Sequence, residues 1–349
     1  MSLHERVARD WYRASLTPLT AALTPVSALF GVAVTLRRAL YRRGWLARHT
    51  VGVPVVVVGN VTVGGSGKTP LVRALVEALR ARGWHPGIVS RGYGGAVSGV
   101  RAVRPDDDPA LVGDEPLLLA REAFVTVGAN RVAAARALLA EHPEIDVIVA
   151  DDGLQHYALA RDVEIVAIDA KHGFGNGWLL PAGPLREGAR RAMDATARVV
   201  TSSADDGPRR AGAFASSLVP LPWRSVDGVT PVPDLAALPR GTVHAVAAIA
   251  HPQRFFDTVA AQGIQAVTHA FPDHHPFRAR DLAFDGARAI LMTEKDAVKC
   301  RRIADARMFC LPVRAAIDPA LVDLIEDRLH GSQAARASRV PGHQGAADL

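Results

Sequence analysis

The stretch VVVVGNVTVGGSGKTP, residues 55–70, decides the fold of this chain, because it reads as a buried strand, a glycine-rich loop and the start of a helix. Four consecutive valines, Val55 to Val58, are typical of a strand that is covered on both faces of a parallel sheet. The residues LVRALVEALRARG after Pro70 predict a helix, with proline near its start and Gly83 after its end. The order strand, loop, helix is typical of a phosphate-binding fold.

The loop is suited to phosphate, although it departs from the usual nucleotide-binding pattern. That pattern, G-x-x-x-x-G-K-[ST], has its first Gly where this chain has Thr62. Glycines let successive backbone N–H groups point at one anion, at a helix N-terminus whose dipole favours negative charge. Lys68 would reach the outer phosphates and Thr69 would bind Mg²⁺, whereas the alternative is a glycine-rich turn that binds nothing. The predicted phosphate-binding residues are Gly64, Gly65, Ser66, Gly67, Lys68 and Thr69.

The positive charge of the chain is concentrated at its N-terminus. Residues 1–50 contain eight arginines against Glu5 and Asp10, which equals the net charge of +6 of all 349 residues. The uncharged run between Arg13 and Arg37 is long enough to span a bilayer, but its threonines and prolines make the span marginal. A helix in the membrane interface and an ordinary buried helix pair are the alternatives. The arginines that follow this run predict that the remainder lies on the cytoplasmic side.

Apolar runs of strand length alternate with helical stretches along the remaining sequence. This alternation predicts an α/β fold with a mostly parallel sheet, helices on both faces, and a second, smaller α/β domain. The strands expected in the larger sheet after the first are 86–90, 124–128, 146–151, 163–169 and 197–202. The segments that we infer are a membrane-associated helical segment (1–50), a phosphate-binding domain (51–214), a proline-rich linker (215–240), the smaller domain (241–330) and a disordered tail (331–349).

The two cysteines indicate neither a zinc site nor a disulfide framework. Cys300 and Cys310 lie ten positions apart, and the chain has no C-x-x-C pair. We therefore expect the protein to work in a reducing cytoplasm.

A second functional stretch ends a predicted strand with two carboxylates. DVIVADDGLQH, residues 146–156, places Asp151 and Asp152 at the carboxyl edge of the sheet, beside the glycine-rich loop. Mg²⁺ bound to a nucleotide needs an acidic partner at this position. Two acids after a strand are also common in an ordinary turn, and it is the loop upstream that favours metal binding.

Three further stretches are unusually rich in polar side chains. Asp114 and Glu115 precede a predicted helix, where they could also act as an N-cap pair. Arg186 and Glu187 could face a phosphate and a substrate hydroxyl. A third stretch joins an acid to two histidines between prolines, which an ordinary solvated turn would also explain. The stretches are GDEPLLLA (113–120), GNGWLLPAGPLRE (175–187) and FPDHHPF (271–277).

Together these stretches resemble the tetraacyldisaccharide 4'-kinase family, the lipid A kinases of Gram-negative bacteria. The resemblance runs from about residue 12 to residue 330, and the family's phosphate loop also lacks the first glycine. One departure is His251, where the family more often has Asn. The matching stretches, in order, are VGNVTVGGSGKTP, SRGYGG (90–95), VGDEPLLLA, ADDGLQH, FGNGWLLPAGPLRE, AIAHPQRFF (248–256), FPDHHPF and MTEKDAVK (292–299).

This resemblance implies ATP-dependent phosphorylation of the 4'-hydroxyl of an acylated glucosamine disaccharide 1-phosphate. It implies ATP and Mg²⁺ as cofactors, with the acylated disaccharide lipid and the membrane surface as partners. The implied location is the cytoplasmic face of the bacterial inner membrane. Neither a nucleic acid nor an obligate protein partner is implied.

The resemblance also implies roles for individual residues. Asp114 and His274 would act together as the base, while Lys68 and Arg186 would stabilise charge on the transferring phosphoryl group. The residues implied to bind Mg²⁺ are Thr69, Glu115, Asp151 and Asp152. The residues expected at the substrate are Asn60, Arg91, Gln155, His156, Glu187 and Asp273.

Two other function classes compete with a lipid kinase. A membrane-tethered GTPase would share the loop and the acids, but it should carry [NT]-K-x-D for guanine, and in TEKD (293–296) Lys and Asp are adjacent. A non-enzymatic protein that binds lipid or nucleic acid could use the arginine-rich N-terminus, but it would have no use for the phosphate loop.

Overall fold

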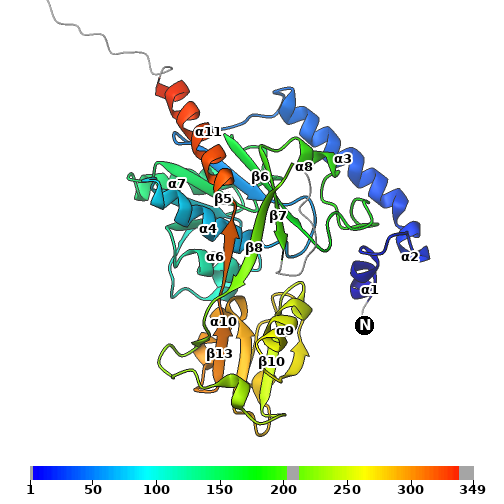
Figure 1. Cartoon of the computed structure of the whole chain (residues 1–349). Helices are drawn as coiled ribbons and strands as arrows, with labels where there is room; N and C mark the ends of the chain where they lie inside the picture. The colour runs from blue at the N-terminus through cyan, green and yellow to red at the C-terminus, as the bar shows by residue number, and fades with distance from the viewer. Residues whose placement is uncertain (1–2, 203–211, 338–349) are drawn as a thin grey trace, which may run out of the picture.

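The computed structural model describes residues 3–202 and 212–337, and within these ranges it contains two sheet-based units and an N-terminal group of helices (Figure 1). The larger unit is built on a nine-stranded sheet with helices on both faces, and the smaller unit on a five-stranded sheet. Helices α1 (Leu3–Asp10), α2 (Pro18–Ala22) and α3 (Thr24–Arg42) lie along one side of the larger unit. The predicted α/β class is confirmed.

The larger sheet is parallel except at its two edges. Its order is β14-β8-β7-β6-β1-β5-β2-β4-β3, in which β3 is antiparallel to β4 and β14 is antiparallel to β8. The strand that leads into the glycine-rich loop, β1, lies in the middle. The strands are β1 (Val55–Gly59), β2 (Pro86–Ser90), β3 (Val100–Val103), β4 (Val125–Gly128), β5 (Val147–Asp151), β6 (Val163–Asp169), β7 (Ala197–Ser202), β8 (Phe214–Pro220) and β14 (Val313–Ile317).

The side chains of β1 point alternately into two cores, which explains the run of four valines. Val56 and Val58 pack in the core formed with α4, α6 and α11, whereas Val55 and Val57 pack in the core formed with α7. A strand covered on both faces has no solvent side, so no polar residue interrupts it. The helices of this unit are α4 (Lys68–Ala81), α5 (Pro109–Val112), α6 (Asp114–Leu119), α7 (Arg131–Glu141), α8 (Arg190–Met193) and α11 (Pro319–Ala337).

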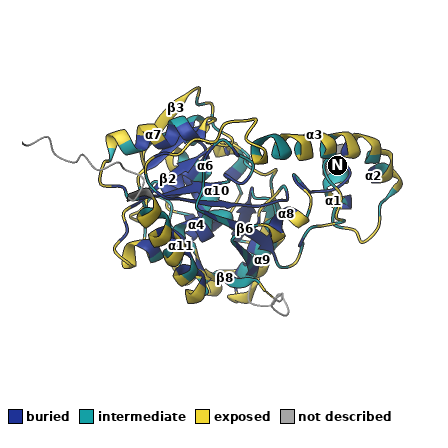
Figure 2. Cartoon of the chain, turned by 90° about the horizontal axis from the view of Figure 1, so that it is seen from above, coloured by how far each residue is buried: buried dark blue, intermediate teal, exposed yellow. Residues whose placement is uncertain are grey.

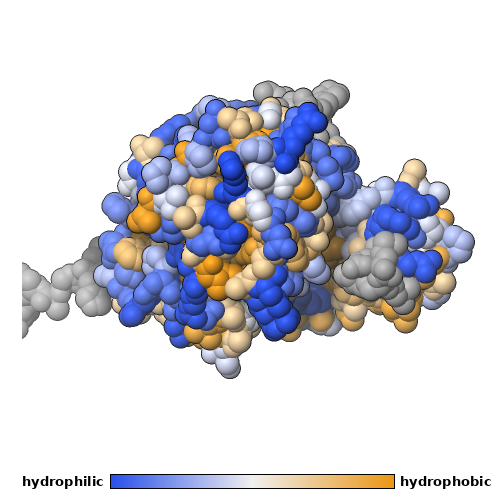
Figure 3. Space-filling model, turned by 90° about the horizontal axis from the view of Figure 1, so that it is seen from below, coloured by the Kyte–Doolittle hydropathy of each residue, from blue (hydrophilic) through white to orange (hydrophobic). Residues whose placement is uncertain are grey.

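The smaller unit repeats this arrangement on a reduced scale. Its strand order is β11-β10-β12-β13-β9, and only β9 runs antiparallel to its neighbour. Helix α9 packs Phe255 and Phe256 on one face of the sheet, and α10 packs Ala297 on the other. The surface at this end of the molecule mixes hydrophilic and smaller apolar areas (Figure 3). The elements are β9 (Arg224–Ser225), β10 (Val243–Ala247), α9 (Pro252–Ala261), β11 (Val267–Ala270), β12 (Ala289–Thr293), α10 (Glu294–Cys300) and β13 (Met308–Leu311), with 3-10 turns at Leu235–Ala237, Ala279–Leu282 and Arg301–Ile303.

Two segments are more ordered than the sequence predicts. Phe214–Pro220, at the start of the expected linker, is strand β8, and it pairs with Val313–Ile317 at the edge of the larger sheet. Its sequence FASSLVP has little strand propensity of its own, so pairing with its neighbours decides its conformation. Helix α11 continues to Ala337, because QAARA is a good helix-forming sequence, and it therefore enters the segment expected to be a disordered tail. The rest of that segment, from residue 338, lies outside the described residues.

The longest N-terminal helix, α3, lies on the surface with one face uncovered (Figure 2). Its inner face touches the loop at Leu179: the Ser27 hydroxyl donates to the Leu179 carbonyl at 2.7 Å, and Gly31 lies beside the Leu179 side chain. Its outer face exposes the apolar side chains of Val26, Leu29, Val32 and Leu36. A buried helix pair is therefore excluded for α3. None of the helices in the described ranges is long and apolar enough to cross a membrane.

Gly59 shows how closely the two functional stretches of the sequence approach each other. A Cβ at Gly59 would lie 2.6 Å from Leu154 Cβ and 3.0 Å from the Leu154 backbone nitrogen. We expect Gly59→Ala to lower the free energy of unfolding by about 1–3 kcal/mol, the usual cost of overpacking. Gly331→Ala is the matched control, since no atom lies within 4 Å of its added Cβ and the residue is within α11. Chemical denaturation of both variants checks this, and an unchanged Gly59→Ala would contradict it.

Candidate active site

The strand order brings the ends of three neighbouring strands to one edge of the larger sheet. β1, β5 and β2 are adjacent and parallel, so the residues that follow their carboxyl ends meet there. The glycine-rich loop follows β1, Asp151 and Asp152 end β5, and Arg91 follows β2. Ser90, the last residue of β2, donates its hydroxyl to Asp151 Oδ2 at 3.3 Å. The predicted phosphate loop and the predicted acids therefore share one site.

The glycine-rich loop has a backbone that only glycine adopts readily. Gly64 and Gly67 have φ of +100° and +73°, and a Cβ on Gly67 would lie 2.7 Å from the Thr201 side chain of β7. The fully buried Asn60 donates its side-chain amide to the Gly64 carbonyl at 3.4 Å. Helix α4 begins at Lys68, so the N–H groups of the loop stand at a helix N-terminus. This geometry can hold an anion.

Asp152 lies between two positively charged side chains at the loop. Its carboxylate lies 3.6 Å from Lys68 Nζ and accepts hydrogen bonds at 3.0 and 3.2 Å from Arg186 Nη1. Burial alone would raise the pKa of Asp152, but Lys68 and Arg186 lower it to about 2, so it stays ionised. Its φ of +47° is unusual for a residue with a side chain and is typical of a functional position.

Asp151 has the opposite environment, in which burial and nearby carboxylates outweigh the effect of Lys68 on its pKa. It is 1% exposed, its Oδ1 has no hydrogen-bond partner among the described residues, and burial followed by the charges of Glu115 and Asp152 raises its pKa to about 7. A divalent cation beside these carboxylates would favour their ionised forms. Within residues 3–202 and 212–337, no three His, Cys, Asp or Glu side chains are arranged to hold a metal by themselves. Mg²⁺ commonly uses only one or two carboxylates together with phosphate and water, so the residues present fit it.

The smaller unit contributes a histidine to the same site. His274, in the loop after β11, places Nδ1 at 3.0 Å from Asp114 Oδ2, although the two residues are 160 positions apart. Because Nδ1 faces a carboxylate, the proton of the neutral ring belongs on Nδ1, which leaves Nε2 as an acceptor. The hydrogen bond to Asp114 raises the pKa of His274, while burial acts to lower it. Like Asp152, His274 has a positive φ, +60°.

Two lysines that the sequence interpretation missed join the two units. Lys295 Nζ lies 3.1 Å from Glu115 Oε1, 3.5 Å from Asp273 Oδ1 and 3.4 Å from His274 Nε2. Lys299 Nζ lies 2.7 Å from Asp296 and 4.0 Å from Asp114. The sequence did contain a signal for both lysines. This arginine-rich chain has only four lysines, and three of them, Lys68, Lys295 and Lys299, lie at the candidate site.

Arg131 is a further charged residue that the sequence interpretation missed. It is 5% exposed, and its guanidinium donates to the carbonyls of Ala129 at 3.1 Å and Asp152 at 3.5 Å. Burial lowers the pKa of Arg131. As the first residue of α7 it looked like an ordinary helix residue, and only the fold places it behind Asp152.

Several residues expected at the substrate make other contacts in this structure. Glu187 is buried, accepts a short hydrogen bond from the Tyr157 hydroxyl and lies 3.7 Å from Arg191. Gln155 donates to the Asn60 carbonyl at 3.0 Å and so supports the loop. Burial followed by nearby arginines lowers the pKa of His156 to about 4. Arg91 is exposed.

The TEKD segment is part of the contact between the units. Asp296 is completely buried and accepts hydrogen bonds from the Ala248 N–H at 3.0 Å and the Thr293 hydroxyl at 2.7 Å. Lys295 is engaged with Glu115, as described above. The side chains of this segment thus serve the fold and the site, and their spacing does not match guanine recognition.

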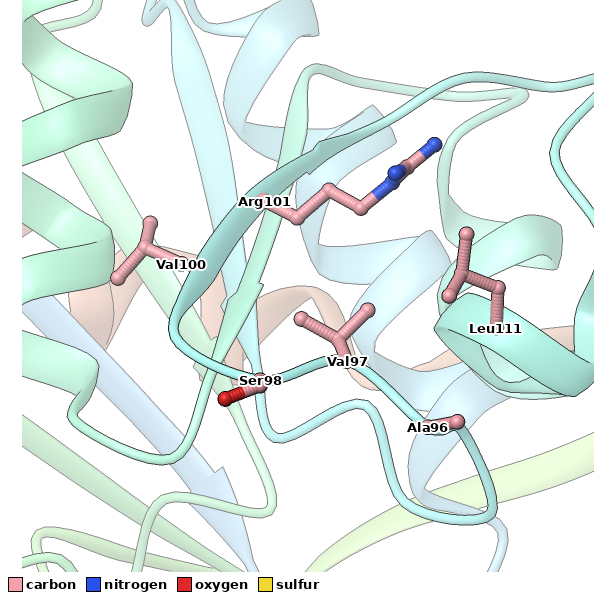
Figure 4. A pocket seen from close by; sticks show the side chains of 6 residues that line it. All are labelled: Ala96, Val97, Ser98, Val100, Arg101 and Leu111. Carbon is pink, nitrogen blue, oxygen red and sulfur yellow. The ribbon is translucent and has the colours of Figure 1, made fainter.

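A surface pocket of about 260 Å³ lies near the site but has a different character (Figure 4). Its only charged lining residue, Arg101, is paired with Asp107 at 2.8 Å. The pocket therefore offers no group for chemistry. Its lining residues are Ala96, Val97, Ser98, Val100, Arg101 and Leu111.

Comparisons with known proteins show what this chain is similar to. Residues 19–330 match the family model described as tetraacyldisaccharide-1-P 4'-kinase. The chain is 49% identical to the tetraacyldisaccharide 4'-kinase of Xanthomonas euvesicatoria pv. vesicatoria over 92% of this chain and 94% of that protein. It is 51% identical to the enzyme of the same name from Azoarcus sp., over 92% and 95%.

A solved structure has a similar fold. The structure of "apo" form LpxK from Aquifex aeolicus in complex with ATP is similar with a TM-score of 0.74 and 28% identity, over 89% of this chain and 99% of that chain. The family match covers most of this sequence and includes every segment of the site described above. The chain therefore belongs to the tetraacyldisaccharide-1-P 4'-kinase family.

Proposed function

We propose that this member of the family transfers the γ-phosphoryl group of ATP to the 4'-hydroxyl of a tetraacylated glucosamine disaccharide 1-phosphate, with Asp114 and His274 as the base. One observation carries the proposal: the His274 imidazole of the smaller unit meets the Asp114 carboxylate of the larger unit at 3.0 Å, at the edge where the phosphate loop lies. A base from one unit thereby faces a nucleotide bound by the other. This arrangement supports the proposal, because the phosphate loop of the larger unit and the His274 loop of the smaller unit lie at one site.

The phosphates of ATP would bind at the glycine-rich loop. Lys68 and Arg186, which now neutralise Asp152 at 3.6 and 3.0 Å, supply positive charge for the phosphoryl group in transit. Phosphoryl transfer needs positioning and charge stabilisation more than covalent chemistry, so these two side chains carry much of the catalytic effect. The backbone N–H groups from Gly64 to Thr69 hold the remaining phosphate oxygens.

Mg²⁺ fits the acids beside the loop. Thr69, Glu115, Asp151 and Asp152 would hold it, and the raised pKa of Asp151 supports a cation there. The bound ion would supply charge neutralisation at the nucleotide phosphates. Asp152 keeps its negative charge in any case, because Lys68 and Arg186 lower its pKa to about 2.

His274 is placed to remove the proton of the acceptor hydroxyl. Its Nδ1 donates to Asp114, so Nε2 carries the lone pair that accepts a proton. Asp114 orients the ring and stabilises its charged form, in the manner of other carboxylate–histidine pairs. Lys295, 3.4 Å from Nε2, and Asp273, 3.7 Å from Nε2, mark where the sugar would bind.

The uncovered face of α3 would bind the membrane in which the acceptor is embedded. The exposed fractions of Leu29, Val32 and Leu36 are 72%, 66% and 57%, and these residues lie on one helix face beside a cluster of arginines. An amphipathic helix with this pattern inserts its apolar side into the interface, and arginine attracts anionic headgroups. The inner membrane surface on the cytoplasmic side is the location that we propose.

Lys68→Ala should abolish nearly all transfer. The lost charge faces the outer phosphates, so we expect kcat to fall on the order of 10²- to 10³-fold, as for other removed charge-stabilising donors. Transfer of labelled γ-phosphate to the acylated disaccharide in mixed micelles measures this. The control is Lys171→Ala, an exposed lysine outside the site. A Lys68→Ala enzyme that keeps more than about a tenth of the activity would rule out the assignment.

The base can be tested by a double-mutant comparison. If Asp114 and His274 act as a unit, Asp114→Ala, His274→Ala and the double variant should lower kcat by similar factors, because such groups are strongly non-additive. The KM for ATP should change little, since neither residue is assigned to the nucleotide. Losses that multiply in the double variant, at saturating ATP and Mg²⁺, would instead place Asp114 with Glu115 at the metal.

The membrane surface can be tested on α3 without touching the site. Leu29→Gln with Leu36→Gln should weaken binding to vesicles that contain anionic lipid by about tenfold or more per residue, given about 1.5–3 kcal/mol for a buried leucine. Co-sedimentation measures the binding, and detergent-solubilised activity should stay normal. Val229→Gln, 82% exposed on the smaller unit, is the control. Equal binding of all variants would show that α3 does not face the bilayer.

A further inference from the structure

The smaller unit is joined to the larger one by two chain crossings that lie side by side. The chain leaves β8 at Pro220 and returns to β14 at Val313, and these two residues are paired in the larger sheet. Both crossings lie at the same edge of that sheet, because β14 is its edge strand and β8 is the strand beside it. Two adjacent crossings can act as a hinge, so side-chain contacts elsewhere must fix the tilt of the smaller unit.

One such contact is a two-pronged ion pair between α9 and the end of β6. The terminal nitrogens of Arg254 donate to both carboxylate oxygens of Asp169, at 2.5 and 2.9 Å. Asp169 is 5% exposed, and although burial would raise its pKa, hydrogen bonds from His172 and Arg254 hold the pKa well below its usual range. Paired guanidinium and carboxylate groups of this kind fix direction as well as distance.

A stack of rings continues the contact toward the phosphate loop. His172 Nδ1 lies 2.9 Å from Asp169 Oδ1, and its ring stacks on His251 with centroids 4.1 Å apart and 10° between the planes. The Tyr12 ring meets the edge of His172 at 4.6 Å. The stack therefore joins the N-terminal segment, the larger unit and the smaller unit.

The segment that contains His251 contacts both the phosphate loop and His274. A Cβ at Gly65 of the phosphate loop would lie 3.4 Å from Ala250 Cβ and 3.9 Å from the His251 ring. Two residues before Ala250, the Ala248 carbonyl accepts the backbone N–H of His274 at 3.3 Å. A shift of residues 248–254 would thus move His274 relative to the loop.

We propose that the Asp169–Arg254 ion pair and the His172–His251 stack form a positioning contact that seats the smaller unit on the phosphate loop and sets the placement of His274. Arg254 is a positioning residue, because it acts through residues 248–254, whose Ala248 carbonyl accepts the backbone N–H of His274. The inference rests on the proposed role of His274 as base. Phosphoryl transfer is sensitive to a displacement of about 1 Å between donor and base, which gives the contact its importance.

A second anchor lies between other elements and does not replace the first. Arg73 of α4 pairs with Glu294 of α10 at 2.6 Å, and Arg121 pairs with Glu294 at 3.3 Å. This anchor holds α10, whereas the Asp169–Arg254 pair holds α9. His274–Asp114 and Lys295–Glu115 also cross between the units, but neither of these contacts involves a residue of α9. We therefore expect the Asp169–Arg254 pair to be needed as well.

The kinetic test is Arg254→Ala. We expect kcat to fall on the order of 10- to 100-fold with the KM for ATP nearly unchanged, and Arg254→Lys to lie in between because lysine keeps the charge but not the two-pronged geometry. Arg82→Ala, which removes an exposed ion pair with Asp323 and should stay at the wild-type rate, is the matched control. Asp169→Asn gives the same test from the other partner if Arg254→Ala fails to fold. Wild-type kcat in either folded variant would overturn the proposal.

A distance measurement tests the positioning directly. Spin labels on cysteines introduced at the exposed Arg136 of α7 and Gln265 of the smaller unit report on the two units, since the native cysteines are buried. We expect a narrow distance distribution for the parent chain and a broader or shifted one for Arg254→Ala. An unchanged distribution would overturn the proposal.

The outcomes separate this inference from the proposed function. An inactive Lys68→Ala with a normal Arg254→Ala overturns the positioning contact and leaves the kinase assignment intact. Full activity of Lys68→Ala overturns the assignment of the phosphate loop, whatever the distance measurement shows.

Discussion

The balance of charge around Asp151 and Asp152 is the constraint on which the rest of the site depends. Asp151 ends the completely buried strand β5 and Asp152 follows it. Asp152 stays ionised because Lys68 and Arg186 lie at 3.6 and 3.0 Å. Asp151 has no such partner, and its pKa rises to about 7. A buried pair of acids is costly unless cations compensate it. In the function that we propose, Lys68 of the loop, Arg186 and a bound metal–nucleotide complex would share this compensation.

Both units contribute residues to the candidate active site. The larger unit carries the phosphate loop and the acids, while the smaller one carries His274, Lys295 and Asp273. Each unit is built on a mostly parallel sheet with its own core. What joins them is mostly polar: ion pairs and hydrogen bonds of side chains from separate elements. Polar contacts are directional, so they suit an interface that fixes how His274 lies relative to the phosphate loop.

Much of the fold could be predicted because its signals are local. The valine run of β1, the glycines of the loop and the proline near the start of α4 act within a few residues, and five further predicted strands of the larger sheet appear as β2, β4, β5, β6 and β7. The features that the sequence did not predict share one cause. β8 has a sequence, FASSLVP, that forms a strand only because β7 and β14 pair with it. The buried position of Arg131 was likewise not predictable, because burial depends on neighbours that are distant in the sequence.

The sequence by itself determined that a strand, a phosphate loop and an acidic strand end occur in this order, because backbone conformation at glycine, proline and valine is limited by local sterics. Through the resemblance of its motifs it also determined the family. The same resemblance implied that Asp114 and His274 act together, and the structure places them 3.0 Å apart. Only the tertiary structure decided that Lys295 bridges Glu115 and Asp273, and that Arg254 pairs with Asp169. These pairs join positions up to 180 residues apart. No local propensity encodes such a contact, since it forms only when two sheets have packed and their strand ends face each other.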